Sequence, residues 1–156
     1  MKKLILIAIL ALGVQSCGIP KYLNTGTIEA QREVVENNKS ALDNYVLANE
    51  WMVEAFNNAE SVIQFSDKEA GIVKGKYSLY SGYTSGYYTI DPVSAIITVR
   101  TKDGSATLSI DTRGNDFQIL KYTDMNLQAH NKGISSEDAK LQINLLIESF
   151  KDRLKH

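Results

Sequence analysis

The sequence predicts an α+β domain that consists of a single antiparallel sheet with helices gathered on one face. Two segments carry apolar residues at helical spacing, and between them lie strands in which apolar and polar residues alternate strictly. An Asp103-Gly104 pair joins two of these strands by a tight turn. The expected order of elements is β-α-β-β-β-β-α, and it makes one domain of residues 27–154.

The first expected elements are a strand at Thr27–Val35 and a helix from Ser40 to about Asn58. The strand has the weaker pattern, whereas the helix has a clear apolar stripe. That stripe consists of Ala41, Tyr45, Ala48, Met52, Ala55, Phe56 and Ala59. A short β-branched and aromatic run, Val62–Ser66, then predicts a second strand.

Three strands with strict alternation follow, at Ile72–Ser81, Val93–Lys102 and Ser105–Asp111. Such alternation means that one face of each strand is buried and the other faces water.

The Asp103-Gly104 turn also predicts how its two strands pair. A two-residue type I′ turn needs positive φ at both central residues, which favours Asp-Gly. It would place Val99 opposite Leu108 and Ile97 opposite Ile110. The apolar pattern demands the same register, because a slip by one residue would turn every apolar side chain outward.

Residues 112–134 have the least regular pattern, with one short strand expected at Phe117–Tyr122. A serine cap at Ser135, followed by acidic residues, then predicts the start of the last helix. The apolar stripe of this helix consists of Ala139, Ile143, Leu146, Phe150 and Leu154.

Composition restricts the kind of protein this can be. The chain has 156 residues, 44% of them apolar, and a formal net charge of −1. A domain of this size buries about two thirds of the surface of its unfolded chain, so its core needs neither a disulfide nor a metal. Nucleic-acid binding normally requires a basic face, which this charge balance does not indicate. No cofactor, metal or nucleic-acid partner is therefore expected.

The first sixteen residues form a separate segment. They begin with Met1 and two lysines, continue with the apolar run LILIAILAL, and end at Ser16, immediately before the chain's only cysteine, Cys17. The apolar run is too short for a transmembrane helix, which takes about 20 residues to cross roughly 30 Å. Residues 1–16 therefore have the layout of a secretory signal peptide.

Val14-Gln15-Ser16-Cys17 resembles the end of a bacterial lipoprotein signal peptide. The resemblance implies that Cys17 becomes an acylated N-terminus and anchors the protein in the cell envelope, facing the periplasm. Residues 17–26 would then be a short tether. Cleavage would reduce the 17 basic side chains to 15 and leave the 18 acidic ones, a formal charge of −3. An ordinary signal peptide with an incidental cysteine is the alternative.

Residues 27–111 also resemble a known family of exported bacterial proteins, described as a domain of unknown function with a TBP-like fold. The resemblance rests on Leu42, Tyr45, Trp51, Phe56, Val62-Ile63, Asp67, Gly71-Ile72, Gly75 and Lys102-Asp103-Gly104. Membership implies the same β-α-β4-α order that the strand and helix patterns predict. It assigns no chemistry to any residue.

The sequence contains no recognised catalytic motif, so we do not expect an enzyme. Gly71 and Gly75 are separated by three residues rather than the four of a Walker loop, and Tyr77 stands where that loop has a magnesium-binding hydroxyl. We interpret Gly71 as the left-handed residue that closes a turn. Gly75 would mark a close approach between its strand and a bulky neighbour. Both histidines, His130 and His156, are expected on the surface.

Three carboxylates leave one enzymatic alternative open. Asp111, Asp116 and Asp124 lie near one another in the sequence, and paired carboxylates hydrolyse glycosidic bonds in many enzymes. The alternative is therefore a hydrolase of envelope polymers.

Two surfaces are candidates for binding a partner. Five of the eight tyrosines fall in the stretch YSLYSGYTSGYY, and tyrosine is favoured in protein interfaces. The second candidate is the polar face of the sheet. On the tyrosine surface we single out Tyr83, Tyr87 and Tyr88, and on the polar face of the sheet we single out Lys74, Lys76, Tyr80 and Arg100. The leading hypothesis is a lipid-anchored cell-envelope domain that binds a protein or a glycan without catalysis, and a purely structural lipoprotein is a further alternative.

Overall fold

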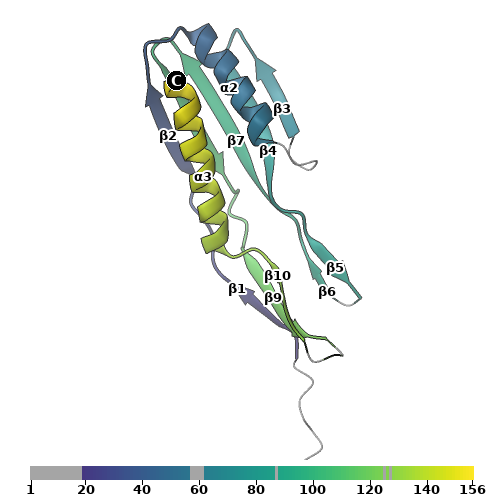
Figure 1. Cartoon of the computed structure of the whole chain (residues 1–156). Coiled ribbons are helices and arrows are strands. Elements are labelled where there is room, and N and C mark those ends of the chain that lie inside the picture. Colours follow the sequence, from purple (N-terminus) through teal and green to yellow (C-terminus); the bar gives the residue numbers. More distant parts are fainter. Residues whose placement is uncertain (1–18, 57–61, 87, 125, 127) are drawn as a thin grey trace, which may run out of the picture.

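The computed structural model describes residues 19–56, 62–86, 88–124, 126 and 128–156. The predicted signal peptide, Cys17 and Tyr87 lie outside these residues. The described elements follow one long axis, with a large sheet and two helices at one end and two small sheets at the other (Figure 1). The C-terminus lies at the large-sheet end, whereas the chain enters the described part at the small-sheet end.

The large sheet confirms the predicted α+β class. It has five antiparallel strands in the order β2-β8-β7-β4-β3. These strands are β2 (Gln31–Glu36), β3 (Val62–Asp67), β4 (Ile72–Tyr80), β7 (Val93–Lys102) and β8 (Ser105–Asp111). The predicted register is also confirmed, since Val99 lies opposite Leu108 and Ile97 opposite Ile110.

Two helices, α2 (Ala41–Ala55) and α3 (Ser136–Lys155), lie side by side on one face of this sheet (Figure 1). Each begins at a serine cap, because the hydroxyl of Ser40 accepts the Asp43 N–H and that of Ser135 accepts the Asp138 N–H. The predicted stripe of α3 is buried as expected. Neither of these described helices is long and apolar enough to cross a membrane.

The core lies between the helices and the sheet. Trp51 of α2 meets Phe150 of α3 edge-on, with ring centroids 5.1 Å apart. A Cβ on Gly75 would collide with the ring of Phe56, which confirms that β4 closely approaches a bulky neighbour there. Gly71 has a φ of +62°, as expected of the residue that closes the turn before β4.

The prediction of a single sheet is wrong, because the described residues also form two small sheets. One has three strands in the order β1-β9-β10, with β1 (Lys21–Asn24), β9 (Gln118–Thr123) and β10 (Ala129–Gly133). The other is the hairpin β5-β6, Tyr83–Ser85 with Tyr88–Ile90. The strand expected at Phe117–Tyr122 is present as β9. The other four strands have only three to five residues, and runs this short carry too few alternations to be recognised. Strand β1 also occupies part of the expected tether.

Candidate functional site

The face of the large sheet that lies away from the helices has no described element packed on it (Figure 1). We call it the open face. Cross-strand pairing places Lys74, Thr98 and Ser109 side by side in one row, and Arg32 of β2 extends that row. The neighbouring row on one side consists of Ile72, Arg100 and Thr107. In the row on the other side, Lys76 lies opposite Ile96.

Several cations of the open face lack an ion-pair partner among the described residues. Among the described residues, no carboxylate lies within 4.0 Å of the charged groups of Lys74, Lys76, Arg100 or Arg32. The first three were singled out in the sequence, and the sheet brings them onto one surface. Arg32 was missed because the pattern of the first strand was too weak to assign its faces, although the expected range, residues 27–35, overlaps β2 (Gln31–Glu36) and includes Arg32.

Exposed apolar side chains flank these cations. Phe65 of β3 lies opposite Lys74, and Val62 lies opposite Lys76. At the opposite edge of the same face, Val34 of β2 lies opposite Thr107. These three side chains are 45–50% exposed. A surface that combines unpaired cations with accessible apolar groups is suited to contact with another macromolecule.

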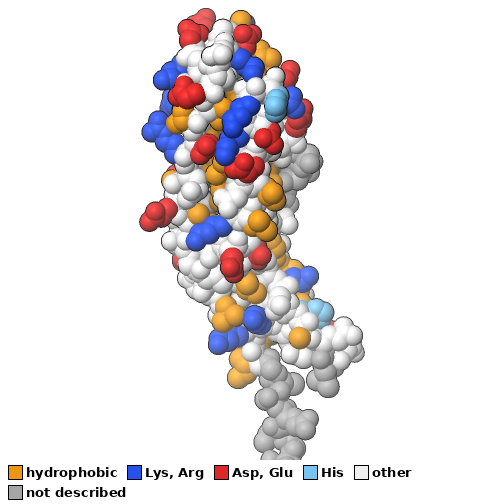
Figure 2. All heavy atoms as spheres, turned by 60° about the vertical axis from the view of Figure 1, so that its left-hand side comes forward, with side chains coloured by type: hydrophobic (Ala, Val, Ile, Leu, Met, Phe, Trp, Pro, Cys, Tyr) orange, Lys and Arg blue, Asp and Glu red, His pale blue; other side chains and the backbone are white. Residues whose placement is uncertain are grey.

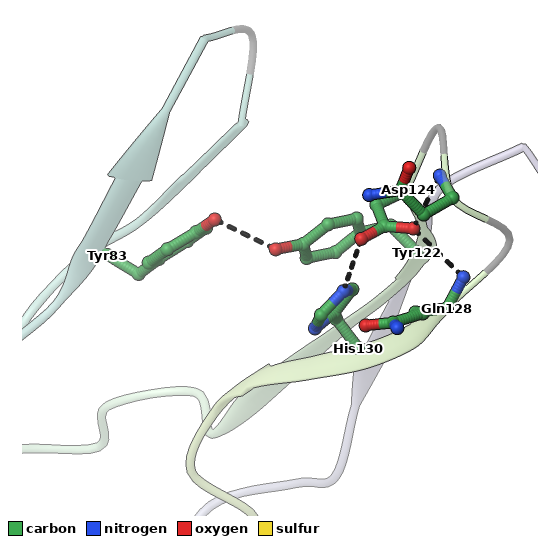
Figure 3. Close-up of polar contacts among 6 residues, drawn as sticks. Tyr83, Tyr122, Asp124, Gln128 and His130 are labelled. Carbon is green, nitrogen blue, oxygen red and sulfur yellow. Dashed lines mark hydrogen bonds and ion pairs between the residues drawn. The ribbon is translucent and has the colours of Figure 1, made fainter.

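Two of the candidate tyrosines, Tyr83 and Tyr88, lie elsewhere, in a cluster that joins the two small sheets (Figure 3). The hydroxyls of Tyr83 and Tyr122 share a hydrogen bond of 2.9 Å. The ring of Tyr122 stacks near Tyr88 on one side, at 5.7 Å between centroids, and near His130 at 5.1 Å. The rings therefore stack on one another, and this aromatic cluster holds β5-β6 against β9-β10.

The hydrogen bond within this cluster shifts the acidity of its members. The bond to Tyr122 lowers the pKa of Tyr83, because the phenolate of Tyr83 would accept it, and the nearby Lys132 ammonium acts in the same direction. That ammonium lies 5.2 Å from the centre of the Tyr83 ring. The same hydroxyl pair raises the pKa of Tyr122.

Asp124 closes the turn between β9 and β10 (Figure 3). Its Oδ1 accepts the N–H groups of Asn126 and Gln128, each at 2.9 Å, and its Oδ2 lies 3.0 Å from Nε2 of His130. The Gln128 N–H and then His130 hold the pKa of this carboxyl below its ordinary value. Asp124 is therefore engaged in forming the turn.

The three loop carboxylates do not gather in one site. Asp111 accepts the N–H of Arg113 at 2.7 Å. Asp116 instead lines a hollow of about 250 Å³ together with Asp91. Throughout the described ranges, no group of three or more His, Cys, Asp or Glu side chains is placed to hold a metal ion.

Tyr80 contributes to the core rather than to the open face. The register shifts between Ser78 and Tyr80, and Tyr80 is half-buried against the core cluster. Sequence alternation alone placed its ring on the open face. The bulge at Leu79 accounts for the difference, because an extra residue changes the direction of the following side chains.

A second hollow, of about 650 Å³, lies between the helices, with Leu47, Trp51 and Ala55 among its lining residues. Arg153 lies at its rim and pairs with Glu50 and Glu54. Unlike the cations of the open face, this arginine therefore has carboxylate partners within the chain.

No family model and no curated protein matches the chain. Two solved structures have similar folds. A DUF4468 family protein from Bacteroides ovatus ATCC 8483 has 18% identity and a TM-score of 0.45, over 77% of this chain and 78% of the other. A TBP-like protein from Parabacteroides distasonis ATCC 8503 has 12% identity and a TM-score of 0.49, over 89% of this chain and 97% of the other. At these scores the similarities support no statement about function.

Proposed function

We propose that this chain is a lipid-anchored protein of the cell envelope whose domain binds an acidic partner protein through the open face, without catalysing a reaction. The single observation that carries this proposal is the set of four cations on the open face, Arg32, Lys74, Lys76 and Arg100, which lack an ion-pair partner in the described part of the chain. Envelope location rests on the lipoprotein-like signal that ends at Cys17.

Two features favour a protein partner over a glycan. The cations stand beside exposed Phe65, Val62 and Val34, and such a mixture is typical of protein interfaces, where an apolar centre adjoins charged groups. Sugars are often bound on free aromatic faces, but the tyrosine rings of the small sheets stack on one another. Because the mature chain would be acidic overall, its cationic face would also orient an approaching acidic partner.

Photo-cross-linking in native membranes tests the binding surface. A p-benzoylphenylalanine at Thr98, which lies in the row between Lys74 and Ser109, should cross-link an acidic protein. Reversing two charges, Lys74→Glu with Arg100→Glu, should lower the yield by about tenfold, because the partner's carboxylates would then be repelled.

The matched control reverses two exposed lysines outside the open face, Lys68→Glu with Lys140→Glu. It makes the same change in net charge and should leave the cross-link intact. An unchanged yield in the open-face variant, or no cross-linked product from native membranes, would argue against the proposal.

Anchoring is tested separately. Cys17→Ala should move the protein from the membrane fraction to the soluble fraction, because the acyl chains have no other attachment point in a chain with one cysteine. A plain signal peptide would give a soluble protein with or without the substitution, and mass spectrometry of the N-terminal peptide would then show no acyl group.

A second candidate function rests on one observation, that Asp91 and Asp116 line the same hollow. A hydrolase of envelope polymers would use two such carboxylates as acid and base. In that case Asp116→Asn should abolish the release of soluble fragments from purified envelope polymer, while Asp111→Asn should not. Equal release by both variants would exclude this hollow as the active site.

A further inference from the structure

The small-sheet end of the molecule lies next to the proposed anchor. The described chain begins at Ile19, two residues after Cys17, and Ile19 is 89% exposed. Two residues span at most about 7 Å. If Cys17 is acylated, which is part of the proposed function, Ile19 is held within that distance of the membrane surface, and β1 begins two residues further on, at Lys21.

Two lysines lie directly opposite each other at this end. Lys21 of β1 pairs with Lys121 of β9 in an antiparallel register, so their side chains are on the same face of the small sheet. Like charges in directly opposed positions are destabilising. Neither ammonium has a carboxylate within 4.0 Å among the residues described, and Asp124 of the adjoining turn is engaged with His130.

The surface around the two lysines is shallowly hollowed. Lys21, Lys121, Ile19 and Asn131 all line a hollow of about 220 Å³. Basic and apolar side chains meet at this end of the molecule, next to the start of the described chain (Figure 2). An anion bound between the two ammonium groups would relieve their mutual repulsion.

We propose that this end is a docking surface for an anionic membrane, with Lys21 and Lys121 binding lipid phosphates and Ile19 entering the interface. Lysines near an anionic surface contribute favourably to binding, and apolar side chains beside them add to it. The acyl chains would hold the protein on the membrane, and this contact would fix its orientation. The long axis would then lead away from the bilayer and leave the open face accessible to its partner.

Vesicle flotation of the unacylated mature chain, from residue 17 with Cys17→Ala, tests this contact apart from the anchor. The chain should bind vesicles of equimolar phosphatidylcholine and phosphatidylglycerol more strongly than vesicles of phosphatidylcholine alone. Lys21→Gln with Lys121→Gln should reduce binding to the anionic vesicles about 25-fold, since each lysine contributes roughly a factor of five. The melting temperature should stay the same or rise, because the repulsion is removed.

The control variant, Lys68→Gln with Lys102→Gln, removes two exposed lysines at the large-sheet end, one from the turn after β3 and one from the end of β7. It should bind like the parent chain. Equal binding to both kinds of vesicle, or an equal loss in the control, would overturn the docking surface. Neither result bears on the acyl anchor, because anchoring is tested separately, by measuring how much of the acylated protein is in the membrane fraction.

Discussion

The two ends of the molecule are held together in different ways. At the large-sheet end, the apolar faces of β4, β7 and β8 pack against α2 and α3 to form one continuous core. At the small-sheet end, ring contacts of the half-exposed Tyr83, Tyr88 and Tyr122 join two short sheets. Ile90 and Leu120 are buried there but do not belong to the main core. Burial therefore sets the stability of one end, and a local aromatic cluster sets the geometry of the other.

The largest effect expected from a single substitution is at the large-sheet end. Phe150 is fully buried and contacts Trp51, so Phe150→Ala should lower the free energy of unfolding by about 3–5 kcal/mol. Urea unfolding followed by tryptophan fluorescence measures this, since Trp51 is the only tryptophan.

The matched substitution at the other end is Tyr122→Ala. It should leave the urea midpoint nearly unchanged and instead lower the hydrogen-exchange protection of the amides in β9 and β10. If it lowered the urea midpoint as much as Phe150→Ala does, the two ends would form one cooperative unit and the comparison would be wrong.

A smaller loss is expected where β4 approaches α2. An added methyl group in Gly75→Ala would collide with Phe56 and approach the carbonyl of Val62, which should destabilise the fold by about 1–3 kcal/mol. Phe56→Ala in the same chain should recover part of that loss by making room, whereas Lys76→Ala on the exposed side of β4 should have little effect. Thermal unfolding by circular dichroism measures all three, and a Gly75→Ala protein as stable as its parent would contradict the close approach.

The same difference between the ends explains how much the sequence could predict. Val99 and Leu108 were placed correctly because alternation and the Asp103-Gly104 turn specify one register independently. Lys74, Lys76 and Arg100 followed from that alternation and lie on one face. The cluster around Tyr122 could not be predicted, because its contacts join residues far apart in the sequence, Tyr83 and Tyr122 among them. No local pattern reports such pairs.

The smallest effect expected is a dependence on pH confined to the small-sheet end. The folded state lowers the pKa of Asp124 from 3.8, through the Gln128 N–H first and His130 second. The ionised carboxylate therefore stabilises the turn fully above pH 3.8, and this contribution is lost as the pH falls through the lower folded-state pKa. Protection factors of the β9 and β10 amides should accordingly drop at acidic pH.

Two variants separate this effect from general acid unfolding. Asp124→Ala should show low protection of β9 and β10 already at neutral pH and no further loss in acid, because the titrating group is gone. Glu69→Ala, in the exposed turn at the opposite end, should behave like the parent chain, since Glu69 makes no hydrogen bond or ion pair with the described residues. If the parent and Asp124→Ala lost protection of these amides over the same pH range, protonation of carboxylates at the large-sheet end would be the cause. The two ends would then lose structure together in acid, and the comparison would be wrong.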